Sequence, residues 1–327
     1  MFMVGFLGSS PQSASARALA QDLAEHRAGG VCFLGHNTKS RPDIEQLTAM
    51  FKDAAGHVVP LVAVDQEGGA VQRLGKRSGY RSFPRANKVA RENSPDKARE
   101  LYHQLALSIK NAGFNLNLSP VIDLGIEPTN PVVYKWGRTF GDNGSTVAAY
   151  AAAFIEAHRN ANILTAAKHF PGHGSTLSDS HASPVDITAT WRTDELTPYR
   201  VLAEQGKLDI VMSGHLSHEQ LTNGLPATLS ARAVRILRQE LGFSGVLMTD
   251  DLDMKAIRSS YSLNDAVLRS IAAGYDLILL SNSLQNDPAL PRRMVAAVTD
   301  AVREGRLSAN SIHESAERLA RLKKTIE

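Results

Sequence analysis

The sequence predicts an α/β protein with a (β/α)8 barrel of the TIM type, in one domain that covers residues 1–327. Eight short apolar runs alternate along the chain with longer stretches in which apolar residues recur at helical spacing. The runs are apolar throughout, as expected for parallel strands that helices cover on both faces. Eight strands close such a barrel, and 327 residues suit one with modest insertions.

The predicted strands and helices follow one another in regular order. The strands are expected at 4–7, 31–34, 61–64, 114–122, 164–169, 210–213, 246–249 and 277–280. The helices include 14–26, 43–54, 95–112, 147–160, 193–205, 231–241 and a closing helix at 308–325. A doubly wound open sheet is the competing arrangement. It normally carries a Gly-rich phosphate loop after its first strand, and the segment 8–11, Gly-Ser-Ser-Pro, is not one.

Composition and charge exclude several classes of protein. The chain is 43% hydrophobic and 21% charged, which is ordinary for a globular protein. Its net charge of +3 comes without a dense basic run, so we predict no nucleic-acid partner. The single cysteine, Cys32, excludes an internal disulfide and is expected to pack in a core. The sequence makes no prediction about the oligomeric state.

No part of the sequence has the length and hydrophobicity of a membrane span. The first residues, Met1 to Leu7, lack the basic segment that opens a secretory signal. We therefore expect a cytoplasmic protein, unless the natural gene begins upstream with an export signal.

Polar and charged residues gather where the predicted strands end. They are Asp65 and Glu67, Asp123, Lys168 and His169, His215, and the pair Asp250 and Asp251. One Asp at a strand end is commonly the N-cap of the next helix. Five strand ends that carry charge or imidazole favour a site, because the carboxyl ends of barrel strands open on one face.

The densest polar cluster follows the fifth predicted strand. Lys-His-Phe-Pro-Gly-His-Gly at 168–174 is followed by Asp179-Ser180-His181. Proline and glycine prevent a helix at 171–174, so the side chains gather on a short constrained loop. Asp179 and His181 are two positions apart. In an extended loop their side chains leave from the same side and can form a hydrogen bond.

These residues favour glycoside hydrolysis over other chemistry. The first strand ends without a metal ligand, so we predict no metal and no cofactor. Lys168 could form a Schiff base, but the adjacent His169 is not what that reaction needs. Hydrolysis of a glycoside requires a carboxylate at the anomeric carbon and a second group that protonates the leaving oxygen. Asp250 is the candidate for the first role, and the Asp179–His181 pair for the second.

The same motifs resemble those of the glycoside hydrolase family 3 β-N-acetylglucosaminidases. The resemblance also includes Thr-Asp-Asp-Leu at 249–252 and runs nearly end to end, from segment 3–6 to segment 274–276. It implies a retaining barrel enzyme in which Asp250 is the nucleophile, His181 the acid/base and Asp179 its partner. The sugar-binding positions that the resemblance implies are Asp65, Arg73, Arg138, Lys168 and His169.

The sequence thus predicts an exo-acting retaining β-N-acetylglucosaminidase whose substrates are GlcNAc-containing glycans, with peptidoglycan fragments as the expected source. The alternatives are a family 3 β-glucosidase, a phosphorylase that transfers the sugar to phosphate, and a silent sugar-binding barrel. We expect Glu67 to be structural support, Asp251 to be a cap or ion-pair partner, and His173 to shape its loop. Trp136 and Trp191 are expected to be buried.

Overall fold

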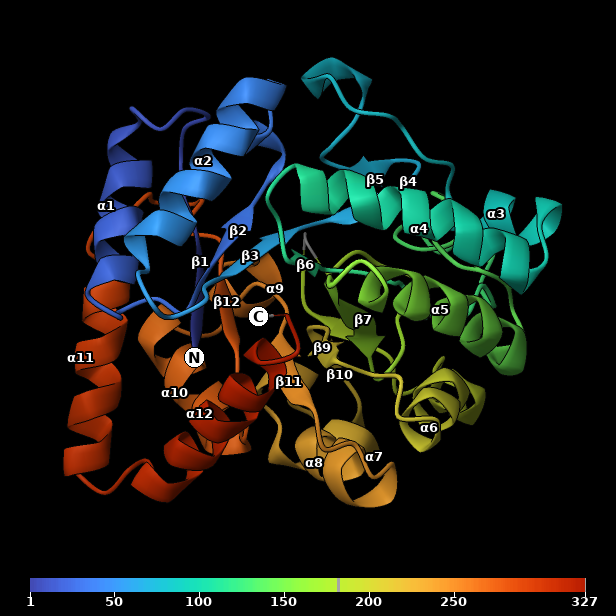
Figure 1. Cartoon of the computed structure of the whole chain (residues 1–327). Helices are drawn as coiled ribbons and strands as arrows, with labels where there is room; N and C mark the ends of the chain where they lie inside the picture. The colour runs from blue at the N-terminus through green and yellow to red at the C-terminus, as the bar shows by residue number, and fades with distance from the viewer. Residues whose placement is uncertain (181–182, 327) are drawn as a thin grey trace.

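The computed structural model describes residues 1–180 and 183–326, and its central feature is a barrel of parallel strands surrounded by helices (Figure 1). In the described residues the barrel sheet has eight strands, in the order β11-β9-β7-β6-β3-β2-β1-β12. They are β1 (Phe2–Gly5), β2 (Gly30–Phe33), β3 (Leu61–Val64), β6 (Leu116–Asn117), β7 (Leu164–Phe170), β9 (Ile210–Ser213), β11 (Val246–Thr249) and β12 (Ile278–Leu280).

The barrel closes between its last two strands. Met248 of β11 forms a parallel bridge with Leu277, directly before β12. The amide of Thr249 donates to the carbonyl of Leu277 at 3.0 Å, and the amide of Leu252 donates to the carbonyl of Leu279 at 3.1 Å. The predicted (β/α)8 fold is confirmed.

Helices connect the strands around the outside of the barrel (Figure 1). They are α1 (Ala14–Ala24), α2 (Arg41–Ala54), α3 (Ala86–Glu92), α4 (Pro95–Asn111), α5 (Gly144–Arg159), α6 (Thr197–Glu204), α7 (Glu219–Thr222), α8 (Ala231–Arg235), α9 (Lys255–Arg258), α10 (Leu263–Ala273), α11 (Leu290–Arg303) and α12 (Ala309–Lys323). The predicted helix at 193–205 begins as a 3₁₀ turn, Thr193–Leu196, before α6. The helix predicted at 231–241 begins as α8 and continues as a π-helical turn, Ile236–Glu240.

Local sequence explains where these helices begin and end. At the start of α2 the Ser40 hydroxyl accepts the amide of Asp43 at 3.3 Å, and α10 begins in the same way, with Ser262 and Asp265 at 3.1 Å. Such caps satisfy amides that have no partner within the helix. Helix α10 ends at Gly274, whose φ of 105° lies in the region that favours glycine.

The fourth barrel strand is shorter than predicted. Of the predicted run 114–122, only Leu116 and Asn117 form β6, with an isolated bridge from Val121 to Lys168. Pro120 has no amide hydrogen to contribute to a ladder. Asparagine side chains replace part of the pairing, because Asn115 Oδ1 accepts the amide of Val62 at 2.7 Å.

The two faces of each barrel strand serve different cores. In β3, Leu61 and Ala63 point into the barrel, while Val62 and Val64 belong to the layer between strands and helices. Cys32 is buried in the barrel interior, as predicted. Leu319 and Leu322 of α12 pack onto the same interior cluster. The side chains that carry chemistry are therefore left to the loops at the carboxyl ends of the strands.

None of the helices in the described part of the chain combines the length and the hydrophobicity needed to span a bilayer.

Candidate active site

A pocket of about 270 Å³ opens among the carboxyl ends of the barrel strands. Its charged and imidazole lining consists of Asp65, Glu67, Arg73, Arg138, Lys168, His169, Asp250 and Asp251. Of the predicted site residues, the structure therefore brings Asp250 together with the whole predicted sugar-binding set. Cys32, Leu118 and Met212 provide an apolar part of the wall.

Asp65, directly after β3, anchors one side of the pocket. Its Oδ1 lies 2.7 Å from the amino group of Lys168, and its Oδ2 lies 3.4 Å from Arg73 Nη2. Arg73 returns to the pocket because a hairpin, β4 (Gln66–Gly68) and β5 (Val71–Gln72), reverses the chain after Asp65. Burial alone would raise the pKa of Asp65, but Lys168 and Arg73 outweigh burial and lower it. The pocket thus presents an ionised carboxylate flanked by two cations.

Glu67 holds two of the pocket's cations. Its carboxylate makes two 2.8 Å contacts to Arg138, through Nε and Nη2, and lies 3.1 Å from the amino group of Lys168. Burial favours the neutral acid, yet the charges of Arg138 and Lys168 lower the pKa of Glu67 to about 2. A carboxylate held in this way is a poor proton donor, and its contacts are those of a support for its neighbours.

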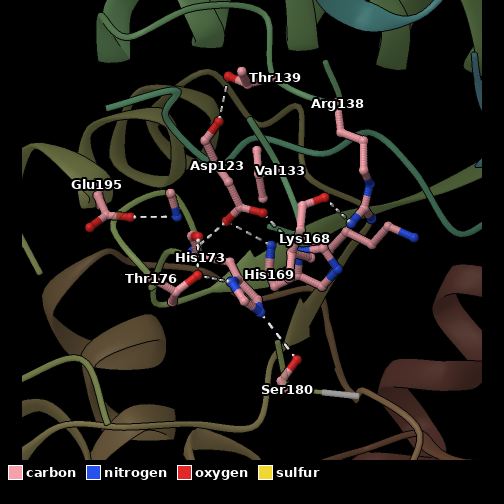
Figure 2. A network of polar contacts seen from close by, with 12 residues as sticks. Asp123, Val133, Arg138, Thr139, Lys168, His169, His173, Thr176, Ser180 and Glu195 are labelled. Atoms are coloured by element: carbon pink, nitrogen blue, oxygen red, sulfur yellow. Dashed lines mark hydrogen bonds and ion pairs between the residues drawn. The ribbon is translucent and has the colours of Figure 1, made fainter. Parts of the chain in front are cut away.

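His169 is oriented by Asp123, which lies after β6 (Figure 2). The ring Nδ1 of His169 is 2.7 Å from Asp123 Oδ2, while Asp123 Oδ1 accepts the backbone amides of His169, at 3.2 Å, and His173, at 2.8 Å. Despite complete burial the pKa of Asp123 is lowered, mainly by His169. Nδ1 is therefore the donor to Asp123, and Nε2 is the ring nitrogen left for a ligand in the pocket.

Consecutive residues of β7 both reach the pocket. Lys168 and His169 line it together, although neighbouring side chains of a regular strand point to opposite faces. The register of β7 against β9 shifts between Lys168 and Phe170, and an irregularity of this kind re-aims side chains at a strand end. The peptide bond between Lys168 and His169 is cis.

The loop after β7 is tied to the protein by buried hydrogen bonds (Figure 2). His173 contacts Thr176 Oγ1 through Nδ1 at 2.7 Å and Ser180 Oγ through Nε2 at 3.1 Å. Burial is the main cause that lowers the pKa of His173 to about 4, so its ring is neutral at pH 7. Glu195, in the 3₁₀ turn before α6, accepts the Gly174 amide at 2.9 Å, and burial raises its pKa to about 7. These contacts match the loop-shaping role expected for His173.

This loop leads to the predicted acid–base pair. Asp179 is half-buried, and its carbonyl accepts the amide of Ser183 at 3.3 Å. His181 lies outside the described residues, so the predicted contact between Asp179 and His181 stays a prediction.

Asp250 follows the last residue of β11. Its amide donates to the carbonyl of Ser213 at 2.9 Å, which continues the strand pairing, and its Oδ1 accepts the amide of Asp251 at 2.8 Å. The side chain is partly exposed and lines the pocket. This position places a carboxylate at the same opening as Asp65 and Lys168.

Asp251 also lines the pocket, although successive side chains of an extended strand point to opposite faces. Strand β11 ends at Thr249, so strict alternation no longer applies two residues later. The cap-like role is observed, because Asp251 Oδ1 accepts the amides of Ser281 at 2.8 Å and Asp253 at 3.0 Å. Burial raises the pKa of Asp251 to about 6.

The other candidates contact groups of the same chain or do not line the pocket. His215 contacts Thr228 through Nδ1 and the carbonyl of Asp251 through Nε2, both at 2.8 Å. Trp191 is partly buried and donates to the carbonyl of Pro171 at 3.1 Å. The expectation of a buried tryptophan is wrong for Trp136, which is 49% exposed.

Sequence reasoning missed part of this network. Asp123 was noticeable at a strand end, but nothing in the sequence pairs it with a histidine 46 positions later. Asn130, Thr176, Ser180 and Glu195 gave no signal, because their contacts exist only after the loops are folded.

Comparison with known proteins decides the family. Residues 2–322 match the family described as the glycosyl hydrolase family 3 N terminal domain. The chain belongs to this family. The β-hexosaminidase LpqI of Mycobacterium tuberculosis is 35% identical over 282 residues, which are 83% of this chain and 70% of the relative. A β-hexosaminidase of Xylella fastidiosa strain M23 is 33% identical, over 88% of this chain and 85% of the relative.

Solved structures of family 3 proteins agree with this assignment. A β-N-acetylglucosaminidase from a Paenibacillus species superposes with a TM-score of 0.89 at 31% identity. It covers 99% of this chain, which in turn spans only 61% of that protein. A family 3 glycosyl hydrolase from Mycobacterium smegmatis has a TM-score of 0.86 at 30% identity, with coverage of 98% and 94%. The predicted family and its β-hexosaminidase branch are confirmed, and the protein is a glycoside hydrolase.

Proposed function

We propose that this protein is an exo-acting retaining β-N-acetylglucosaminidase that removes terminal β-linked GlcNAc, with the barrel at 1–327 as its catalytic unit. The observation that carries the proposal is the position of Asp250, which lines one pocket with Asp65, Arg73, Arg138, Lys168 and His169. The names of the family 3 relatives support GlcNAc as the sugar that is removed, because they are β-hexosaminidases and a β-N-acetylglucosaminidase.

The proposed reaction has two steps. In the first, a carboxylate oxygen of Asp250 bonds to the anomeric carbon while the bond to the leaving oxygen breaks, and His181 gives that oxygen its proton. In the second, water bonds to the anomeric carbon, the ester to Asp250 breaks, and the proton of the water returns to His181. Asp179 is the partner that orients the imidazole of His181.

The remaining pocket residues are proposed to bind the sugar. The Asp65 carboxylate accepts hydrogen bonds from sugar hydroxyls, and Lys168 and Arg73, which flank it, donate to sugar oxygens. His169, held through Nδ1 by Asp123, offers Nε2 to the same ring. Charged hydrogen bonds of this kind are worth about 1.5–3 kcal/mol each, which is enough to fix one ring in place.

We further propose GlcNAc-containing fragments of peptidoglycan as the natural source of the substrate. A cytoplasmic location stays a prediction.

Hydrolysis of 4-nitrophenyl β-N-acetylglucosaminide by the wild type and by Asp250→Ala tests the proposal, with the matching β-glucoside in parallel. We expect turnover of the acetamido sugar that is lost in the variant. Turnover of the glucoside alone would keep the mechanism and replace the substrate. A sugar 1-phosphate formed with added phosphate would indicate a phosphorylase, and no turnover of either glycoside would favour a sugar-binding barrel.

A further inference from the structure

The loop between β7 and Ser180 is fastened from two directions by groups that the proposed reaction does not use. From one side, the side-chain Nδ2 of Asn130 donates to the carbonyl of His173 at 2.8 Å and to Thr176 Oγ1 at 3.0 Å. From within the loop, the His173 ring contacts Thr176 and Ser180. All four side chains are buried, with exposed fractions between 0% and 2%. Bulk water therefore does not compete for these contacts in the folded protein.

The hydrogen bonds have a preferred direction. The hydroxyl of Thr176 lies 3.0 Å from the carbonyl of His173 and can donate to it. If it does, Thr176 accepts from Nδ1–H of the neutral ring, and Nε2 is then the acceptor for the hydroxyl of Ser180. If the ring proton were on Nε2 instead, Thr176 would have to donate to Nδ1 and would lose its hydrogen bond to the carbonyl of His173. The tautomer with the proton on Nδ1 therefore makes one more hydrogen bond. His173 thus acts as a bridge between Thr176 and Ser180.

Ser180 is the residue between Asp179 and His181 in the sequence. Consecutive Cα atoms are about 3.8 Å apart, so a hydrogen bond that fixes the Ser180 side chain also restrains the adjacent backbone of Asp179. The amide of His173 is itself fixed on Asp123, the carboxylate that also orients His169. A chain of contacts therefore leads from the floor of the pocket to the segment of Asp179.

We propose that His173 and Ser180 are positioning residues for the proposed acid–base step: they fix the segment that carries Asp179 and leads to the acid/base residue. This inference rests on the proposed function. General acid catalysis contributes about 10²- to 10⁴-fold to a rate, and it depends on a proton donor within hydrogen-bonding distance of the leaving oxygen. A displacement of about 1 Å can cost about 10²-fold.

The test compares substrates that differ only in their need for the acid. Phenyl β-N-acetylglucosaminide has a poor leaving group that must be protonated, while the 2,4-dinitrophenyl glycoside departs without help. For Ser180→Ala we expect kcat/KM to fall about 30-fold on the phenyl substrate and less than about threefold on the dinitrophenyl substrate. A merely structural role would lower both values equally.

Ser315→Ala is the matched control. Ser315 is also buried, and its hydroxyl donates to Asp276 Oδ1 at 2.7 Å, in a network that does not include the pocket residues. We expect this variant to lose thermal stability and to keep the ratio of the two kcat/KM values. His173→Gln is the second variant, for use if Ser180→Ala does not fold. It loses the bridge to Thr176, and a loss with the same substrate preference is expected.

An equal loss of Ser180→Ala on both substrates, or no loss on the phenyl substrate, would overturn the inference and leave the proposed function intact. If the wild type hydrolyses neither substrate, the proposed function fails and the inference falls with it. Activity in the wild type that is lost in Asp250→Ala would support the proposed function, and the Ser180→Ala comparison then tests the inference alone.

Discussion

The carboxylate of Glu67 accepts two hydrogen bonds from the guanidinium of Arg138, each 2.8 Å long, although the two residues are 71 positions apart in the sequence. Both side chains are largely buried, with exposed fractions of 6% and 10%. The pair links the hairpin after β3 to the loop before α5. Because Glu67 also contacts Lys168, it fixes two of the proposed sugar-binding cations at once.

Glu67→Gln is therefore expected to destabilise the fold and to weaken substrate binding. Removing one partner of a buried ion pair leaves a buried charge uncompensated, and the expected loss in free energy of unfolding is about 3–5 kcal/mol. Urea denaturation measures this loss. The control is Glu317→Gln, which breaks an exposed 3.9 Å pair with Arg321 and is expected to cost less than about 1 kcal/mol. Equal effects of the two variants would contradict the prediction.

Asp65→Asn tests the proposed contact to the sugar. The substitution keeps the shape of the side chain but removes the charge that faces Lys168 and Arg73. A hydrogen bond to a charged group contributes about 1.5–3 kcal/mol, so kcat/KM is expected to fall about 10- to 100-fold. Steady-state kinetics with the chromogenic substrate gives this number. An unchanged kcat/KM would remove Asp65 from the binding set.

Glu195 makes stability depend on pH. Burial raises its pKa from 4.5 to about 7, so the folded state favours the protonated acid. Its stabilising contribution is complete below about pH 4.5 and is lost as the pH rises through about 7, by roughly 3 kcal/mol in all. We expect the melting temperature of the wild type to fall relative to that of Glu195→Gln between about pH 4.5 and pH 7.5, and the difference to stay constant above this range. Parallel melting curves for the two proteins over this range would refute the assignment.

Asp276 fastens the end of the barrel that faces away from the pocket. Its buried carboxylate contacts Arg238 at 2.7 Å and Arg318 of α12 at 2.9 Å, and it accepts the amide of Leu247 at 2.8 Å. Asp276→Asn removes the carboxylate that both arginines share and leaves Arg318 only its 3.9 Å pair with Glu314, and we expect a loss of about 3–5 kcal/mol in free energy of unfolding. The KM of the folded variant should not change. A raised KM would show that this network reaches the pocket.

The barrel was predictable because its signals are local. Each apolar run that forms a strand is a few residues long, and the strands 61–64, 210–213 and 246–249 have the predicted limits. The first strand was predicted at 4–7 and is observed at 2–5, and the prediction of 114–122 departs furthest from the structure. There, side-chain amides such as that of Asn115 replace part of the backbone pairing, and an apolar run does not reveal this.

The site was predictable as a set of strand ends and not as a network. A barrel brings the ends of its strands together, so Asp65, Lys168 and Asp250 could be assigned to one opening. The contacts of Glu67 with Arg138 and of Asp123 with His169 depend on how two loops fold against each other. The sequence holds no periodicity that records such contacts, and the same applies to His173 and Ser180.

The pairing of β1 with β12 has a consequence for how the protein folds during its synthesis on the ribosome. Residues 2–4 align with residues 278–280, so this ladder joins the first strand of the barrel to the last one in the sequence. While the chain is being synthesised, β1 can pair with β2 on one side, but its other edge exposes unpaired amides and carbonyls until β12 emerges. Contacts between such distant segments also form slowly. We expect nascent chains stalled before residue 278 to be protease-sensitive and to require a chaperone that shields this edge.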